Sequence, residues 1–387
     1  MTSSRALPST LSRRATLAGT ATAALATSLT AGAASAAPER HHRFPGLPTL
    51  SPRQQAGQRV IASYSGLTPP PELIEAIRAG EIGGVIFFGE NITSTAQIAE
   101  VTARLRRAHR HSPTRAFPLI LTTDQEGGVV RRLKDQEPTL TAKQMGASTD
   151  YVGVSAASGA GAAVGLHRAG MNLNLAPVLD VYRAEGNFDD KFGRSFSSDP
   201  AKVAACGTAF LTAQQQRGIG STVKHFPGLG AATVDQNTDL VKLVLTQSAE
   251  EIRGVDELPF RSAVKAGVDL VMTSWAVYPA LDPTYPAGLS RRIVQGELRD
   301  RLRFRGVTIT DALEAGSLGE FGEVPQRAVS SADAGMDVLL ASSRQVADGL
   351  GSVTALTYAR QDRRLGAREW DAALQRVMRL RWRLRTR

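Results

Sequence analysis

The sequence predicts a single-domain (β/α)₈ barrel, and two observations lead to this fold. Short apolar runs rich in β-branched residues alternate with longer stretches of helical periodicity through most of the 387-residue chain. Polar residues also follow several of these runs directly, as they do where the strands of a barrel end. Repeated strand–helix units over this length fit a closed parallel barrel better than an open sheet.

Eight apolar runs are the predicted strands. They are residues 59–62, 84–88, 119–122, 173–176, 221–224, 270–273, 307–310 and 338–340. Long helical patterns between them are predicted crossover helices. These include residues 95–107, 155–169, 200–216, 248–266 and 291–302. We therefore expect one barrel domain at residues 53–345, followed by a helical extension over residues 346–387 that packs on the barrel.

The N-terminus carries the pattern of an export signal. Adjacent Arg13 and Arg14 precede an uncharged stretch that ends in small residues around Ala36. This order predicts a cleaved signal peptide over residues 1–37, and the paired arginines favour the twin-arginine route. The stretch is too rich in Ala, Thr, Ser and Gly for a stable membrane span. Residues 38–52 are expected to be a linker, and the mature protein is expected to be secreted.

Charge and cysteine content narrow the function classes. The formal net charge is +10, but the basic residues are scattered and do not alternate with aromatic residues, so no nucleic-acid partner is expected. The basic stretch 379–387 is interpreted as a solvated helix end. The chain shows no spacing typical of metal or nucleotide sites, so no metal and no cofactor are predicted. The single cysteine, Cys206, is expected to be a buried thiol.

Five short motifs at predicted strand ends carry the functional signal. They are Asp124-Gln125-Glu126-Gly127-Gly128, the segment from Asn174 to Asp180, Arg194-Ser195-Phe196, Lys224-His225-Phe226-Pro227-Gly228 and Thr310-Asp311-Ala312-Leu313. Charged side chains at a barrel mouth are costly unless they are paired, so their recurrence at one pole favours a sugar site. In this order the motifs resemble glycoside hydrolase family 3, most closely its single-domain bacterial β-N-acetylglucosaminidases. The resemblance covers residues 55–341.

The resemblance implies roles for individual residues. Asp311 would be the nucleophile that forms a covalent glycosyl-enzyme. The family's sugar-binding residues correspond to Asp124, Arg132, Arg194, Lys224 and His225. Adjacent Arg131 leaves the choice of arginine open. A retaining glycosidase needs an ionised carboxylate beneath the sugar ring, and a rigid strand end supplies one. A helix N-cap role would explain the residue type of Asp311, but not the other four motifs.

One loop departs from the family pattern. The enzymes that the chain resembles carry an Asp-x-His pair there, whose histidine is the general acid/base, whereas this chain reads Asp235-Gln236-Asn237. An amide has no proton to donate at a useful pKa, so Asn237 is expected to contact substrate only. Three interpretations stay open. Asp239, which we prefer, or Asp235 serves as the acid, or the protein binds glycans and turns them over poorly.

The sequence therefore predicts a retaining glycosidase that removes terminal β-linked N-acetylhexosamine from cell-wall or chitin-type glycans. One alternative is a glycan-binding protein without an effective acid/base, which the missing histidine motivates. The other is a β-glucosidase-like hydrolase. Relatives with that activity usually carry the acid in a second domain, and the short remainder of the chain after residue 341 leaves no room for one.

Overall fold

The computed structural model describes residues 44–386. The expected signal peptide, residues 1–37, and the first part of the expected linker lie outside the described residues. The end of that linker, residues 44–51, has no regular secondary structure and leads into helix α1 (Pro52–Gly57), which the side chain of Ser51 caps. Within residues 44–386, no helix combines the length and the apolar character that a membrane span requires.

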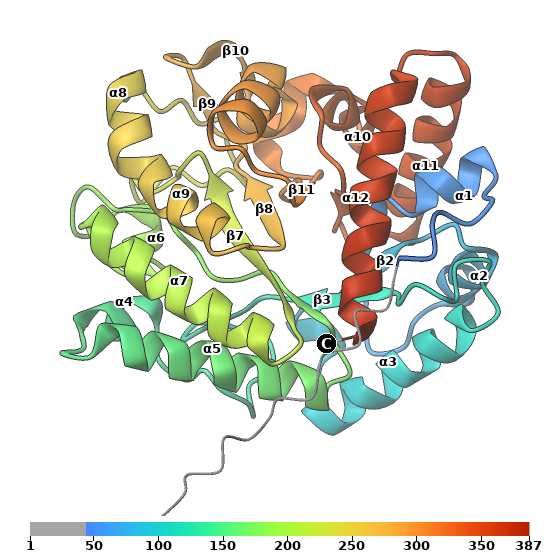
Figure 1. The fold of residues 1–387 in the computed structure, drawn as a ribbon, viewed down its shortest axis with the longest axis horizontal. Coiled ribbons are helices and arrows are strands. Elements are labelled where there is room, and N and C mark those ends of the chain that lie inside the picture. Colours follow the sequence, from blue (N-terminus) through green and yellow to red (C-terminus); the bar gives the residue numbers. More distant parts are fainter. Residues whose placement is uncertain (1–43, 387) are drawn as a thin grey trace, which may run out of the picture. The chain divides into compact units, whose positions relative to one another are not determined.

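All eight predicted strands form, and together they make a parallel barrel (Figure 1). They are β1 (Val60–Ala62), β2 (Gly84–Ile86), β3 (Ile120–Thr123), β6 (Leu173–Asn174), β7 (Gly220–Phe226), β8 (Leu270–Thr273), β11 (Val307–Ile309) and β12 (Leu339–Ala341). Their hydrogen-bonded order is β11-β8-β7-β6-β3-β2-β1-β12. A single parallel bridge from Ile309 to Val338 then joins the two outer strands. The predicted barrel is confirmed, with its ring of strands nearly closed.

The helices cover the outside of the barrel (Figure 1). The longer ones are α2 (Pro71–Ala79), α3 (Thr95–His109), α5 (Tyr151–Arg168), α7 (Pro200–Gln216), α10 (Val324–Ala334) and α11 (Val346–Gln361). Side-chain caps mark the starts of α3, α5 and α7. The side chain of Ser94 accepts a hydrogen bond from the Gln97 N–H at the start of α3, and Asp199 caps α7 just before Pro200. Helix α7 consequently begins and ends at the predicted residues.

Two predicted helices contain wide π-helical turns. The helix expected at residues 248–266 forms as α8 (Ala249–Glu251), the π-helix η2 (Ile252–Asp256) and α9 (Glu257–Lys265). The helix expected at residues 291–302 forms as the π-helix η4 (Arg292–Arg301). A π-turn shifts the hydrogen-bond ladder by one residue, and the apolar pattern of the sequence does not record this shift.

Short elements lie in the loops around the barrel. They are η1 (Gly89–Asn91), β4 (Gln125–Gly127), β5 (Val130–Arg131), α4 (Ala142–Ala147), α6 (Phe188–Lys191), β9 (Val277–Tyr278), β10 (Asp282–Pro286), η3 (Ala287–Leu289) and η5 (Gly316–Phe321). The β4–β5 turn depends on Gly127 and Gly128, whose φ angles are 121° and 54°. A side chain there would be strained, and a Cβ on Gly127 would lie 2.2 Å from the Leu140 carbonyl oxygen.

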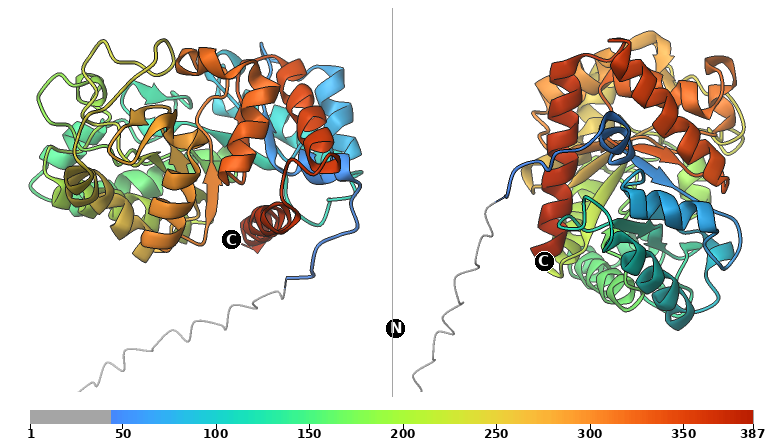
Figure 2. Two further views of the ribbon diagram at one scale, coloured as in Figure 1. Left: turned by 90° about the horizontal axis from the view of Figure 1, so that it is seen from above. Right: turned by 90° about the vertical axis from the view of Figure 1, so that its right-hand side faces the viewer.

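The last helix, α12 (Ala367–Thr386), closes the end of the barrel at which the strands begin. Figure 2 shows it as a long helix apart from α10 and α11. Its Val377, Leu380 and Leu384 pack with the apolar side chains that fill the barrel interior. Arg381 is fully buried beside them and donates hydrogen bonds to the carbonyl oxygens of Pro118 and Phe117, each at 2.8 Å. The expected solvated helix end is therefore wrong at Arg381, while Arg379 and Arg383 are exposed.

Cys206 lies on α7 and is buried as a free thiol. Burial raises the pKa of this thiol above its usual value, so the thiol is held in its unreactive form. The expectation of a buried thiol is confirmed.

Candidate active site

A pocket of about 410 Å³ lies where the barrel strands end. Eight of the nine predicted site residues line it: Asp124, Arg132, Arg194, Lys224, His225, Asn237, Asp239 and Asp311. They come from loops and strand ends that are as much as 187 residues apart in sequence, between positions 124 and 311. A barrel brings such residues together because all parallel strands end at the same face.

Asp311 follows β11, at the point where its backbone leaves the barrel. One carboxylate oxygen, Oδ1, accepts a hydrogen bond of 2.8 Å from the Ala312 N–H. The other, Oδ2, lies 3.9 Å from Nε2 of His225. The side chain is 22% exposed, so the carboxylate is fixed by its neighbours but still reachable from the pocket. This arrangement leaves an oxygen of Asp311 available to a ligand.

His225 is held in place by the buried carboxylate of Asp180. Its Nδ1 lies 2.7 Å from Asp180 Oδ2, and the other oxygen of Asp180 accepts hydrogen bonds from the main-chain N–H groups of His225 and Leu229. Burial opposes a charge on the imidazole, but Asp180 and then Asp311 favour it, and together they raise the pKa of His225. The imidazole ring thus lies between two carboxylates, with Nε2 directed towards Asp311.

A buried ion-pair network fixes the remaining polar wall. Lys224 Nζ lies 2.7 Å from Asp124 Oδ1 and 2.8 Å from Glu126 Oε1. Arg194 makes two hydrogen bonds of 2.9 Å to the two oxygens of Glu126 and one of 3.0 Å to Asp189. Burial disfavours ionised Glu126, but the two cations outweigh it and hold its pKa well below the usual range.

Paired cations of this kind do not need to rearrange when a ligand enters the pocket. Lys224 and Arg194 expose only 3% and 16% of their side chains, and both are already oriented by carboxylates. The donors are therefore preorganised, which lowers the cost of ordering them on binding.

Arg132 is the arginine that faces the pocket. Its Nε is buried without a hydrogen-bond partner among residues 44–386. Arg131 does not line the pocket, and its Nη1 is directed to the Gln136 carbonyl oxygen. Arg131 is the last residue of the short strand β5, whereas Arg132 lies in the bend that follows it. An unpaired buried donor at the pocket wall is suited to a ligand oxygen.

The loop that carries Asp239 rests on the loop after β11. The Gly316 N–H donates a hydrogen bond of 2.8 Å to the Asp239 carbonyl oxygen, and the Ser317 N–H donates one of 3.1 Å to the Thr238 carbonyl oxygen. Asp239 lines the pocket at its rim, where its side chain is exposed to solvent. Partial burial and then the negative charge of Asp311 raise the pKa of its carboxyl group.

Asp235 lies on the same loop but outside the pocket lining, and it is exposed to solvent. Asn237 does line the pocket, and its Oδ1 accepts a hydrogen bond of 2.9 Å from the Asp239 N–H. The amide at position 237 therefore orders the backbone of Asp239. Of the two carboxylates that the sequence proposed as an acid, only Asp239 reaches the pocket.

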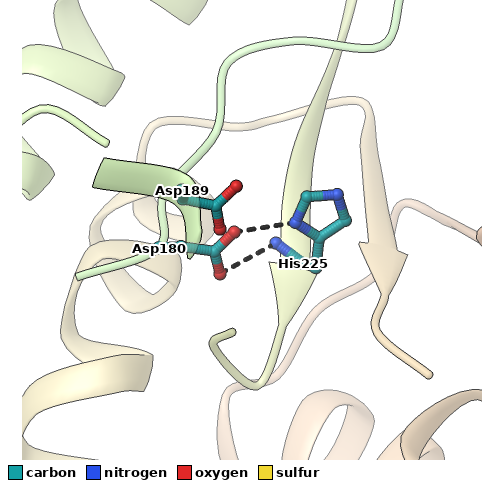
Figure 3. A group of neighbouring side chains, drawn as sticks. All are labelled: Asp180, Asp189 and His225. Carbon is teal, nitrogen blue, oxygen red and sulfur yellow. Dashed lines mark hydrogen bonds and ion pairs between the residues drawn. The ribbon is translucent and has the colours of Figure 1, made fainter. Parts of the chain in front are cut away.

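Asp180, Asp189 and His225 form a compact group whose ligand atoms lie within 4.8 Å of one another (Figure 3). Such a group can in principle hold a metal ion. Here, however, both oxygens of Asp180 accept hydrogen bonds and Asp189 pairs with Arg194. Burial raises the pKa of Asp189 to about 6 despite this ion pair. The contacts account for Asp180 as the support of His225 and for Asp189 as a partner of Arg194.

Several residues of the site were not assigned a role from the sequence. Glu126 and Asp189 orient Arg194, and Asp180 orients His225. Glu126 and Asp180 do lie within the sequence motifs, so they could have been found as carboxylates beside predicted sugar ligands. Asp189 stands in no motif, and only the structure brings it to Arg194.

Comparisons with known proteins give a consistent result. Residues 58–380 match the profile of the glycosyl hydrolase family 3 N-terminal domain. A relative from Arthroderma benhamiae, named an uncharacterized secreted glycosyl hydrolase, is 47% identical over 331 residues, which cover 85% of this chain and 93% of the relative.

Two solved structures are also similar. A glycoside hydrolase family 3 β-N-acetylglucosaminidase from Paenibacillus superposes with a TM-score of 0.81 at 31% identity, over 87% of this chain and 63% of that one. A β-N-acetylhexosaminidase from Beutenbergia cavernae superposes with a TM-score of 0.79 at 31% identity, over 87% of this chain and 99% of that one. The second protein has the same extent as the barrel described above.

Proposed function

The chain belongs to glycoside hydrolase family 3, and on this premise we propose that it removes terminal β-linked N-acetylhexosamine from glycans by a retaining mechanism. One observation carries the proposal: two carboxylates with different environments, Asp311 and Asp239, face one pocket lined by preorganised donors. Retaining glycosidases need such a pair, with one carboxylate ionised as the nucleophile and the other protonated as the acid.

In this proposal Asp311 attacks the anomeric carbon. Its Oδ1 is held by the Ala312 N–H, and its Oδ2 lies 3.9 Å from Nε2 of His225, so the carboxylate is held at the pocket wall. The attack forms an ester bond between Asp311 and the sugar and breaks the glycosidic bond, so the leaving oxygen needs a proton. A water molecule then attacks the anomeric carbon, cleaves the ester and returns the Asp311 carboxylate, while its proton goes to the residue that protonated the leaving oxygen.

The sugar ring is held by the polar wall of the pocket. One oxygen of Asp124 is bound to Lys224, so the other is available to ring hydroxyls. Lys224 and Arg194 donate to sugar oxygens, and the unpaired Nε of Arg132 is suited to a further oxygen such as that of an N-acetyl group. None of these contacts requires a metal ion or a cofactor.

Asp239 is the proposed general acid. Its raised pKa keeps a proton available at higher pH than an ordinary aspartate would, and its backbone is fixed on the loop that follows Asp311. Asp235 is exposed outside the pocket and is not favoured for this role.

Kinetics with two nitrophenyl glycosides test the proposal. The protein is expected to hydrolyse nitrophenyl N-acetyl-β-glucosaminide well and nitrophenyl β-glucoside poorly, and Asp311→Ala is expected to abolish turnover with an unchanged circular dichroism spectrum. Preference for the glucoside would favour a β-glucosidase-like activity instead. Binding of the N-acetylated sugar with negligible turnover of chitobiose, but brisk turnover of the aryl glycoside, would favour a glycan-binding protein without an effective acid.

Export is a separate part of the proposal. The paired Arg13 and Arg14, the uncharged stretch after them and the secreted relative support cleavage near Ala36 or Ala37 and release of a mature enzyme that acts on cell-wall or chitin-type glycans. Replacing both arginines by lysine is expected to retain the full-length protein in the cytoplasm. Unchanged secretion of this variant would point to the general secretory route.

A further inference from the structure

A second groove, of about 480 Å³, lies beside the active-site pocket on the outer side of α10. Leu289, Val329 and Leu365 form its apolar floor. Tyr285 and Phe321 form one wall, with ring centroids 6.1 Å apart and planes tilted by 41°. The groove thus combines an apolar floor with an aromatic wall.

The aromatic wall is open to a ligand. Tyr285 is 46% exposed at the end of β10, while Phe321 packs partly against the core. Exposed tyrosines also occur singly on this protein, as at Tyr358 on α11, and a lone exposed ring needs no functional explanation. Tyr285 differs because it borders a groove and stands next to a second ring.

Charged side chains surround the groove at its rim. Arg291 is ion-paired with Glu369 at 3.7 Å. The guanidinium groups of Arg292 and Arg364 have no hydrogen-bond or ion-pair partner among residues 44–386, and both are exposed. Aromatic rings that can cover the C–H face of a sugar, beside free donors for its hydroxyl and N-acetyl oxygens, match the chemistry of a glycan.

The groove is also within reach of the active site. Ala315 lines the active-site pocket and Phe321 lines the groove. The six residues of η5 between them span about 12 Å at the rise of a 3₁₀-helix. A short oligosaccharide covers such a distance, so one glycan chain can occupy both places.

We propose that this groove is a second glycan-binding site, in which Tyr285 and Phe321 stack on a sugar of a chain whose terminal unit lies in the active-site pocket. The identity of the ligand rests on the proposed function. The groove would favour long glycans over disaccharides and aryl glycosides, because only a long chain reaches it.

The test compares substrates of different length. We would measure kcat/KM on nitrophenyl N-acetyl-β-glucosaminide, chitobiose and chitohexaose for the parent enzyme and for Tyr285→Ala, Tyr285→Trp and Tyr358→Ala. Tyr285→Ala is expected to lower kcat/KM on chitohexaose by about three- to tenfold, mainly through KM, and to leave the two short substrates unchanged. Tyr285→Trp should keep kcat/KM on chitohexaose near the parental value, and Tyr358→Ala should leave kcat/KM on all three substrates unchanged.

An equal loss on short and long substrates, or full activity of Tyr285→Ala on chitohexaose, would overturn the proposal. Electrophoresis through a gel containing glycol chitin tests the same groove without catalysis. Tyr285→Ala should be retarded less than the parent protein and than Tyr358→Ala, even if the parent hydrolyses none of the substrates. Equal retardation of the three proteins would exclude the groove as a glycan site, whereas failure of hydrolysis alone would count only against the proposed activity.

Discussion

Gly316 is the position at which the Asp239 loop rests on the barrel, and it offers a test that leaves every polar side chain of the site in place. Its N–H donates 2.8 Å to the Asp239 carbonyl oxygen. A Cβ at position 316 would lie 2.5 Å from the Leu240 carbonyl oxygen and 2.9 Å from the Asp239 carbonyl oxygen. Both are main-chain atoms, so they cannot rotate away. Gly316→Ala is therefore expected to push the Asp239 loop off its support.

The size of the effect follows from this geometry. Overpacking of this kind costs about 1–3 kcal/mol, and the loop can relieve the strain by moving outward. If Asp239 donates the proton, a displacement of roughly 1 Å should slow hydrolysis of chitobiose by about 10- to 100-fold. A nitrophenyl glycoside should lose far less, because its phenol leaves without much assistance from an acid.

The matched control is Gly319→Ala, in the same short helix η5, where an added Cβ meets no atom within 4 Å. Steady-state kinetics on both substrates and thermal unfolding curves would be recorded for the two variants. Retention of the parental chitobiose rate by Gly316→Ala would refute the role of the docked loop. Equal losses on both substrates would show that the change had disturbed Asp311 instead.

Two further predictions concern the acid and the closed end of the barrel. Asp239→Asn should slow chitobiose hydrolysis by about a hundredfold and remove the decline of kcat/KM at high pH. That decline reflects loss of the proton from a carboxyl group with a raised pKa. Asp235→Asn should leave the pH profile unchanged, and identical profiles for both variants would exclude Asp239 as the acid. Arg381→Ala should lower the free energy of unfolding by about 2–4 kcal/mol in denaturant titrations, because buried carbonyl groups lose their donor. Arg379→Ala, at an exposed position, should lower it by less than about 1 kcal/mol. Similar values for the two variants would show that the burial of Arg381 is unimportant for stability.

Most strands and helices of the barrel could be predicted from the sequence because the signals for them are local. Each buried strand is a short apolar run, and α7 is bounded by a readable cap at Asp199 and by Pro200. The pole at which the site lies was also predictable, since polar residues follow the strands. Asp311, Lys224 and His225 consequently lie in one pocket, as expected.

Other features depend on contacts between distant segments, which no local pattern records. The choice of Arg132 over Arg131 follows from the β4–β5 hairpin, and the support of Arg194 by Asp189 follows from the path of a loop. Arg381 has the sequence context of a solvated helix end, but it is buried because α12 crosses the base of the barrel and meets the Phe117 and Pro118 carbonyl groups just before β3.

The two candidate acids show the same limit. The sequence placed Asp235 and Asp239 on one loop, four residues apart, and could prefer one over the other only slightly. The structure separates them because the loop docks through the Asp239 carbonyl group, and Asp239 lines the pocket whereas Asp235 does not.

Trapping of the glycosyl-enzyme would identify the nucleophile. The protein would be incubated with a fluorinated N-acetylglucosaminyl fluoride, which forms the intermediate faster than water removes it, and then digested and analysed by mass spectrometry. We predict a single added sugar on the peptide that contains Asp311, and none in Asp311→Ala. A label on another carboxylate, or an inverted product with no label at all from an active enzyme, would contradict the assignment of Asp311 as the nucleophile.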